Sequence, residues 1–370
     1  MSNGKLTIGF VRRGYSPSGG AESYLKRLAR GISDLGHDAE LITTTDWPEK
    51  EWPFGPIARL EGRSIIAFAD AAEKVRMQDG CDVLMSLERI WRCDIYRAGD
   101  GVHRAWLERR EGMAGPFANF WHRFNRKHHD ILRLEKSLLA ERGAGRVIAN
   151  SQMVKNEIVD FYGYPADRID IVRNGVPLEQ FRFDPAVRER SRTDLKLRPD
   201  EITLLFVGSG WERKGLRFAI AAMRKRENPN LRMLVVGRGN ERKHKSPGVE
   251  FFGELTDLQR VYAAADIFIL PTIYDPFSNG CLEALASGLP VITTRANGFS
   301  EIMDDHVHGS IVDLPSNIEA LSDAILFWAD PSKRAAARLA TVERASHFDI
   351  SQNVEQTLGI LMACAKRGEP

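Results

Sequence analysis

Hydrophobic residues along the chain form short runs that alternate with segments of helical period. The first run is 6–11 (LTIGFV), and after a glycine turn four apolar residues recur at helical spacing: Leu25, Leu28, Ile32 and Leu35. Similar runs follow at 39–43, 82–86, 146–149 and 169–172, and a second series lies at 203–208, 231–237, 266–271 and 290–294. Such runs between helical segments predict an α/β protein whose parallel sheets carry helices on both faces.

The two series of strands predict two doubly wound domains, in keeping with a length of 370 residues. A polar stretch that contains prolines, 174–199, separates them. We expect a first Rossmann-like domain at 1–176, a second at 177–347 and a final helical segment at 348–370. Ligands of such sheets bind at the carboxyl ends of the strands, so the turns there are where we look for function.

Composition and charge exclude several classes. Hydrophobic residues make up 43% and charged residues 28%, with a net charge of +2, so a dedicated nucleic-acid binder is disfavoured. The four cysteines (Cys81, Cys93, Cys281, Cys364) lack zinc-ligand spacing and fit a reducing compartment. The first fifteen residues contain no apolar stretch long enough for a signal peptide, and no apolar run approaches the ~18 residues that span a bilayer. We expect a cytoplasmic protein, at most peripheral on the inner membrane.

Three glycine turns suggest phosphate binding but fit neither the GxGxxG nor the Walker pattern, which disfavours a dehydrogenase. Gly19 and Gly20 directly precede the first helix, where backbone N–H groups and the helix dipole attract anions. The same glycines also suit a plain tight turn, and this motif alone does not decide between the two.

The second domain carries a more specific set of charges. Arg213 and Lys214 follow a strand end, where cations in hydrogen-bond reach would neutralise a diphosphate. Two carboxylates lie eight positions apart, Asp275 in a loop and Glu283 on the next helix, and Gly280 between them permits close approach of the backbone to a ligand.

In order and spacing the chain resembles the retaining glycosyltransferase family 4, with Asp275 where the family has the first Glu of its E-x7-E motif. The matching positions are Gly19-Gly20, Asn150-Ser151, 174–176, 213–215, the Asp275/Glu283 pair and 297–301. The resemblance implies the GT-B fold, two Rossmann-like domains facing across a cleft with the last helix crossing back to the first. It also implies retaining, metal-independent transfer of a hexosyl group. UDP-glucose is the favoured donor, with UDP-galactose, UDP-N-acetylglucosamine and GDP-mannose left open.

The resemblance also assigns roles to residues of the second domain. Glu283 would accept hydrogen bonds from the ribose hydroxyls, and Arg213 and Lys214 would neutralise the diphosphate, helped by the amides of Gly19 and Gly20. Asp275 would hold the donor sugar together with the following loop, which consists of Phe277, Ser278, Asn279 and Gly280. A catalytically silent nucleotide-sugar-binding or scaffold protein is the alternative.

The acceptor side is assigned to the first domain, which resembles lipopolysaccharide core glucosyltransferases near residues 94–106. Asp100 would orient the acceptor hydroxyl and count among the catalytic residues with Arg213, Lys214 and Asp275; His103 is the second choice. A capping role in a turn is an equal alternative for Asp100 or His103.

A basic segment with an aromatic face follows at 117–136, where five basic and two acidic side chains give a net charge of +3. Its candidate membrane-contacting residues are Phe117, Phe120, Trp121, Arg123, Phe124, Arg126 and Lys127. Such a helix can lie in an anionic membrane interface. Packing of the aromatic rings on the first domain is the alternative.

Overall fold

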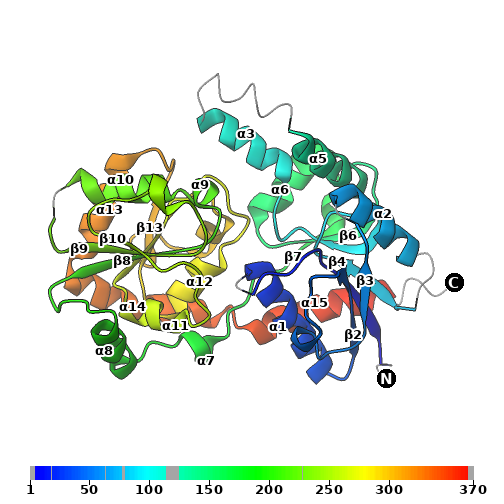
Figure 1. The fold of residues 1–370 in the computed structure, drawn as a ribbon, viewed down its shortest axis with the longest axis horizontal. Helices are drawn as coiled ribbons and strands as arrows, with labels where there is room; N and C mark the ends of the chain where they lie inside the picture. Colours follow the sequence, from blue (N-terminus) through cyan, green and yellow to red (C-terminus); the bar gives the residue numbers. More distant parts are fainter. Residues whose placement is uncertain are drawn as a thin grey trace. The chain divides into compact units, whose positions relative to one another are not determined.

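The computed structural model describes residues 5–17, 19–62, 64–76, 80–113, 125–226 and 228–365. The chain divides into two compact units (Figure 1). Unit 1 consists of Met1–Arg173 and Ile350–Pro370, and unit 2 of Asn174–Asp349. Each unit is built on its own parallel sheet.

Unit 1 contains a seven-stranded sheet in which every neighbouring pair is parallel. Its spatial order is β3 (Ile57–Leu60), β2 (Asp38–Thr44), β1 (Thr7–Val11), β4 (Val83–Ser86), β5 (Cys93–Arg97), β6 (Ala144–Ala149) and β7 (Ile169–Ile171). The order changes direction between β1 and β4, which is the position where doubly wound sheets bind ligands.

Helices cover both faces of this sheet. They are α1 (Gly20–Asp34), α2 (Ile65–Arg76), α3 (His103–Met113), α5 (Arg126–Leu139), α6 (Gln152–Tyr162) and α15 (Ile350–Ala365), with 3₁₀ turns η1 (Glu49–Glu51) and η2 (Ala166–Arg168). The apolar face of α1 is buried together with Val354, Leu358 and Leu361 of α15. A Cβ at Gly31 would lie 2.8 Å from Val354, so the absence of a side chain there allows α1 and α15 to pack closely. The C-terminal helix is therefore part of the core of unit 1.

Unit 2 contains a six-stranded parallel sheet. Its order is β10 (Val249–Phe251), β9 (Leu231–Val236), β8 (Ile202–Val207), β11 (Ile267–Leu270), β12 (Val291–Thr294) and β13 (Gly309–Val312). The helices are α7 (Leu178–Phe181), α8 (Pro185–Asp194), α9 (Trp211–Lys214), α10 (Leu216–Lys225), α11 (Gln259–Ala264), α12 (Asn279–Ala286), α13 (Ile318–Ala329) and α14 (Pro331–Ser346), with η3 (Glu241–Lys243) and η4 (Gly298–Ile302). In Figure 1, α10 and α13 lie on one face of the sheet and α11, α12 and α14 on the other.

The division between the units falls at 173/174 and 349/350, whereas the sequence suggested 176/177 and 347/348. The polar stretch 174–199 is not a linker between the units. It forms α7 and α8, and α8 is held to unit 2 because Arg188 and Arg192 both pair with the buried carboxylate of Asp266, at 2.6 and 3.2 Å. Polar residues that look like a linker in the sequence are therefore structural ones.

Four short strands, β3, β5, β10 and β13, were not predicted from the sequence. They have three to five residues each and carry charged or small residues, so they lack the apolar run that marks a buried strand. Residues 94–97, the start of the segment assigned to the acceptor side, belong to β5. In the described ranges no helix combines the length and apolar character needed to cross a membrane.

Candidate functional site

The cation turn of unit 2, which joins β8 to α10, is fixed by glycines. Gly210 and Gly215 have φ of 75° and 79°, a region that favours glycine, and a Cβ at Gly215 would lie 1.9 Å from the carbonyl oxygen of Pro271. The carbonyl of Arg213 accepts hydrogen bonds from the backbone N of Ile273 (2.8 Å) and from Oγ1 of Thr272 (2.9 Å). These contacts place the two cations beside the segment that follows β11.

The two adjacent cations have different surroundings. Nζ of Lys214 forms an ion pair with Oδ2 of Asp275, whose side chain is buried. The guanidinium of Arg213 is half-buried and forms no ion pair with any residue in the described part of the chain. The structure thus brings together two predicted catalytic residues, Lys214 and Asp275, as partners of each other, and gives Arg213 no counter-ion among the described residues.

Asn174 and Asn297 hold the loop that follows Asp275. Oδ1 of the fully buried Asn297 accepts hydrogen bonds from the backbone N of Ser278 (3.3 Å) and Phe299 (3.1 Å). Nδ2 of Asn174 donates to the carbonyl of Phe277 (3.2 Å) and to Oδ1 of Asn279 (2.6 Å). Rigid support of this kind presents the 277–280 backbone in one conformation.

The α12 helix carries Glu283. Oγ of Ser278 caps this helix by accepting a hydrogen bond from the backbone N of Cys281 (3.3 Å). Glu283 is 8% exposed, and its Oε2 accepts a hydrogen bond from the hydroxyl of Tyr262 at 3.0 Å. Tyr262 is not identifiable from the sequence, because no motif spacing connects it with Glu283.

In unit 1 the carboxyl ends of the strands carry a charge network centred on Arg12. Its guanidinium lies 2.7 Å from Glu88, 3.0 Å from Glu22 and 3.8 Å from Asp100. Burial opposes the charge of Arg12, but the neighbouring carboxylates of Glu88, Asp100 and Glu22 raise its pKa above the ordinary value. Burial raises the pKa of Glu88, and Arg12 opposes that rise. Asp100, the predicted acceptor residue, has a half-exposed carboxylate at the edge of this network.

Another buried carboxylate of unit 1, Glu135 of α5, binds the N-terminus of α3. Glu135 is 1% exposed, and Oε1 accepts hydrogen bonds from Nε of Arg89 (2.9 Å) and from the backbone N of His103 (2.8 Å). Oε2 accepts from the backbone N of Arg104 (3.2 Å) and from the hydroxyl of Tyr162 (2.7 Å). Glu135 therefore satisfies the N-terminus of α3, which fixes the position of the predicted acceptor residue His103.

The imidazole of His103 is paired with that of His128, since its Nε2 lies 3.0 Å from Nδ1 of His128. Burial, together with the nearby positive charge of Arg89, lowers the pKa of His103 to about 3. His103 is therefore neutral at physiological pH and is already engaged in a hydrogen bond within unit 1.

The glycines Gly19 and Gly20 stand at the N-terminus of α1, as N-cap and first helical residue. A Cβ at Gly19 would lie 1.8 Å from Oε2 of Glu22, so the carboxylate of Glu22 lies directly against this terminus. Nη2 of Arg12 lies 3.0 Å from Oε1 of the same carboxylate. The helix terminus thus already faces one negative charge, and phosphate binding by Gly19 and Gly20 stays a prediction.

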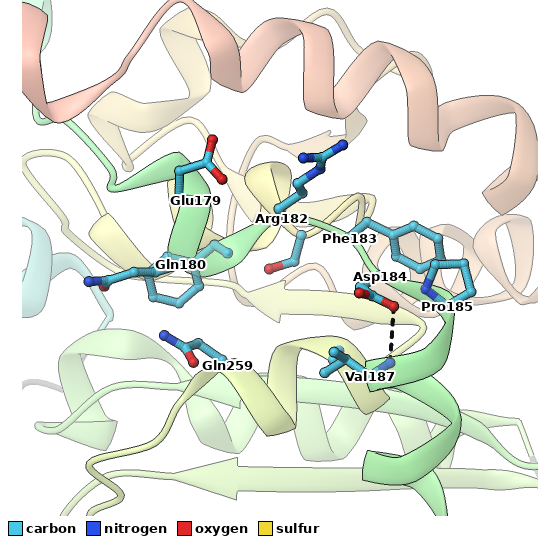
Figure 2. A pocket seen from close by; sticks show the side chains of 11 residues that line it. Glu179, Gln180, Arg182, Phe183, Asp184, Pro185, Val187 and Gln259 are labelled. Atoms are coloured by element: carbon cyan, nitrogen blue, oxygen red, sulfur yellow. Dashed lines mark hydrogen bonds between the residues drawn. The ribbon is translucent and has the colours of Figure 1, made fainter.

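A cavity of about 510 Å³ opens on unit 2 beside α7, α8 and α11 (Figure 2). It is lined by Glu179, Gln180, Phe181, Arg182, Phe183, Asp184, Pro185, Val187, Gln259, Ala263 and Ser287. The predicted site residues do not line this cavity.

The candidate membrane-contacting residues of unit 1 lie only partly within the described residues. Phe117, Phe120, Trp121, Arg123 and Phe124 lie outside the described residues. The other two candidates for membrane contact, Arg126 and Lys127, are exposed in the first turn of α5. Within the described ranges no group of three or more His, Cys, Asp or Glu is arranged to hold a metal ion.

Comparison with known protein families gives two matches that follow the two units. Residues 18–180 match the model described as Glycosyltransferase Family 4, and residues 201–330 match the one described as Glycosyl transferases group 1.

Among curated proteins, an uncharacterized glycosyltransferase of Methanocaldococcus jannaschii is 25% identical, with 86% of this chain and 87% of that protein covered. The lipopolysaccharide glucosyltransferase WaaG of Escherichia coli is 23% identical over 94% of this chain and 96% of its own length.

Solved structures show the same architecture. The crystal structure of WaaG, described as a glycosyltransferase involved in lipopolysaccharide biosynthesis, superposes with a TM-score of 0.82 at 21% identity, covering 96% of this chain and 99% of that one. The Anabaena protein HepE, solved in complex with UDP and glucose, gives a TM-score of 0.76 at 18% identity and covers 97% of this chain and 100% of its own. At these identities the likeness establishes the two-domain fold.

Proposed function

Because the chain is a glycosyltransferase of the GT-B fold, with a family 4 region followed by a group 1 region, we propose that it is a retaining hexosyltransferase using UDP-glucose. The acceptor is a glycan or a lipid-linked glycan such as a lipopolysaccharide core. The similarity to WaaG over nearly the full length supports this acceptor class, and the HepE complex with UDP and glucose supports this donor.

The observation that carries the proposal is the arrangement of charges at the carboxyl end of the unit 2 sheet. Arg213 has no partner among the described residues, and it stands next to Lys214, which is paired with Asp275. A diphosphate leaving group fits this arrangement. Its negative charge would serve as the counter-ion of the Arg213 guanidinium, and it could share the ammonium group of Lys214 with Asp275. The buried carboxylate of Glu283 is the candidate for the ribose hydroxyls, and the 277–280 backbone with Asp275 for the hexose.

During transfer the bond between the anomeric carbon and the β-phosphate oxygen breaks, and negative charge grows on the diphosphate. Arg213 and Lys214 stabilise that charge where the bond breaks, an effect that accelerates the reaction because it strengthens toward the transition state. With these two cations at the leaving group, transfer does not require a metal ion. The acceptor hydroxyl attacks from the face that the leaving group vacates and gives its proton to the departing β-phosphate oxygen, which retains the configuration.

The acceptor would be oriented in unit 1 by Asp100, whose carboxylate is half-exposed beside Arg12. His103 is the weaker candidate for this role because its ring is already paired with His128. The reaction would take place in the cytoplasm, at the cytoplasmic face of the inner membrane if the acceptor is lipid-linked.

Donor binding and turnover together test the proposal. Thermal melting of the protein with UDP-glucose, UDP-galactose, UDP-N-acetylglucosamine and GDP-mannose identifies the donor, since a ligand of the folded state raises the melting temperature. Release of UDP from that donor, with truncated lipopolysaccharide as acceptor and with EDTA present, is the expected result. Stabilisation by a nucleotide sugar without UDP release would instead indicate a silent nucleotide-sugar-binding protein. Loss of activity in EDTA, restored by Mg²⁺ or Mn²⁺, would contradict metal independence.

A further inference from the structure

Tyr262 is fully buried in unit 2 and packed on two sides by aromatic rings. Its ring stacks on that of Phe268 from β11 (centroids 5.9 Å apart, 22° between planes) and meets the ring of Phe181 edge-on (5.5 Å, 86°). Phe181 also lines the cavity beside α7, α8 and α11, whereas Tyr262 is not among the residues that line it. With its ring held in this way, the phenol can direct its hydroxyl group in only one direction.

That hydroxyl reaches two atoms of α12. It lies 3.0 Å from Oε2 of Glu283 and 3.2 Å from the carbonyl oxygen of Gly280. A Cβ at Gly280 would lie 3.3 Å from the hydroxyl oxygen, tighter than most side-chain contacts, so glycine at this position lets α12 approach Tyr262 closely. The hydroxyl has a single proton to donate, so these two acceptors share one donor, and the carboxylate of Glu283 is the nearer of the two.

Glu283 needs such a partner because its side chain is only 8% exposed, and a buried carboxylate is costly without a hydrogen-bond donor. A glutamate side chain otherwise has three rotatable bonds, and a ligand would have to order it on binding. A carboxylate accepts up to about four hydrogen bonds, so the bond from Tyr262 does not by itself exclude the two hydroxyls of a ribose.

We infer that Tyr262 is a positioning residue for nucleotide recognition: its hydroxyl holds the Glu283 carboxylate in the orientation that accepts the ribose hydroxyls of the donor. This inference rests on the proposed function, in which Glu283 binds the ribose. Tyr262 does not touch the donor and acts only through Glu283.

The test compares Tyr262→Phe with a matched control, Tyr164→Phe in unit 1. Tyr164 is also buried, and its hydroxyl donates to the carbonyl of Ala144 at 2.9 Å, so each variant loses one buried phenolic hydroxyl. Calorimetry with UDP should give roughly 10-fold weaker binding for Tyr262→Phe, as for loss of a hydrogen bond to a charged group. Tyr164→Phe should bind UDP like the wild type. The same comparison in steady-state kinetics should show a raised KM for the donor with kcat within about twofold.

Two further readouts separate positioning from a merely structural role. The preference for UDP over 2′-deoxy-UDP should shrink in Tyr262→Phe, because a misdirected carboxylate no longer distinguishes the missing hydroxyl. In a Glu283→Ala background, Tyr262→Phe should cause no further loss of affinity. If Tyr262→Phe does not fold, Phe181→Leu, which removes the edge-on support of the ring, should shift the UDP preference in the same direction by a smaller factor.

The possible failures are distinguishable. In one outcome, Glu283→Ala weakens UDP binding, but Tyr262→Phe has the UDP affinity of the wild type and the same preference for UDP over 2′-deoxy-UDP. The positioning role is then wrong and the proposed ribose contact stands. The positioning role would also be overturned if Tyr262→Phe lowered the UDP affinity by the same factor in the wild-type protein and in the Glu283→Ala variant. If Glu283→Ala itself binds UDP like the wild type, the ribose assignment falls, and this inference falls with it.

Discussion

The two units use charged side chains differently at the carboxyl ends of their sheets. In unit 1 the two charge networks around Arg12 and Glu135 are matched within the fold: Arg12 lies within 4 Å of three carboxylates, and Glu135 receives Arg89, a tyrosine hydroxyl and two backbone N–H groups. In unit 2 Lys214 is paired with Asp275, but Arg213 beside it forms no ion pair with the described residues.

This contrast indicates how each charge contributes. A buried charge with partners on all sides is part of the fold, and removing one partner leaves the other uncompensated. A cation such as Arg213, which has no partner among the residues that the structure describes and lies in a glycine turn at the carboxyl end of a sheet, is available to a ligand. We therefore expect substitutions in the unit 1 network to affect stability first, and substitutions in the unit 2 set to affect donor binding and turnover first.

The largest effect is expected for Glu135→Gln in unit 1. The substitution keeps the size of the side chain but leaves the Arg89 guanidinium without its counter-ion, which should lower the free energy of unfolding by about 3–5 kcal/mol. Glu141→Gln is the control, because its ion pair with Lys136 (3.2 Å) is exposed on both sides and should contribute no more than ~1 kcal/mol. Chemical denaturation measures the free energy of unfolding of both variants. If both lost the same small amount of stability, the network around Glu135 would not be structural.

Arg213→Ala should have the largest effect on catalysis. Loss of one electrostatic contact to the leaving group should lower turnover roughly 10²–10³-fold, with the melting temperature unchanged because Arg213 forms no ion pair within the described part of the chain. Arg217→Ala is the control, since Arg217 is an exposed cation on α10 close in sequence.

Lys214→Ala should lower turnover by a similar factor and also destabilise the fold, because it leaves Asp275 buried and unpaired. Near-normal turnover in both variants would remove the diphosphate assignment.

A smaller effect is expected for Glu283→Ala, which should weaken binding of the nucleotide roughly 10- to 100-fold while changing kcat little. A ribose contact is the same in the ground state and the transition state, so it contributes to binding and not to the chemical step. Calorimetry with UDP measures the change, and Glu319→Ala, at an exposed carboxylate on α13, is the control. Unchanged affinity would mean that Glu283 is only a structural residue of α12.

The smallest effect concerns the basic segment of unit 1. Replacing Arg123, Arg126 and Lys127 with Ser should reduce co-sedimentation with anionic liposomes, at ~1 kcal/mol per cation, and the wild-type binding should fall as salt rises. Serine at Lys243 and Lys245, two exposed cations of unit 2, is the control. If the wild-type protein co-sediments with neither anionic nor neutral liposomes, the segment does not bind membranes.

The sequence predicts much of the fold because buried strands leave apolar runs, and β1, β4, β8, β9, β11 and β12 follow such runs closely. It also identifies Arg213, Lys214, Asp275 and Glu283, because they lie in one motif set with fixed spacing. The sequence does not predict how these residues pair. Lys214 meets Asp275 across 61 positions, and Tyr262 meets Glu283 across 21. Glu135 has its partner Arg89 46 positions away. Such contacts depend on tertiary packing, which no local pattern records.

The central claim, that the nucleotide sugar binds at the carboxyl end of the unit 2 sheet, is tested most directly by hydrogen–deuterium exchange with and without UDP-glucose. Binding should slow exchange in the cation turn at 208–216 and in the 274–283 loop and helix start, whose backbone amides would contact the diphosphate and the hexose. Exchange at 100–104 in unit 1, where Glu135 already satisfies the α3 terminus, should stay unchanged. Protection confined to 100–104, with none in the two unit 2 segments at saturating UDP-glucose, would contradict the account.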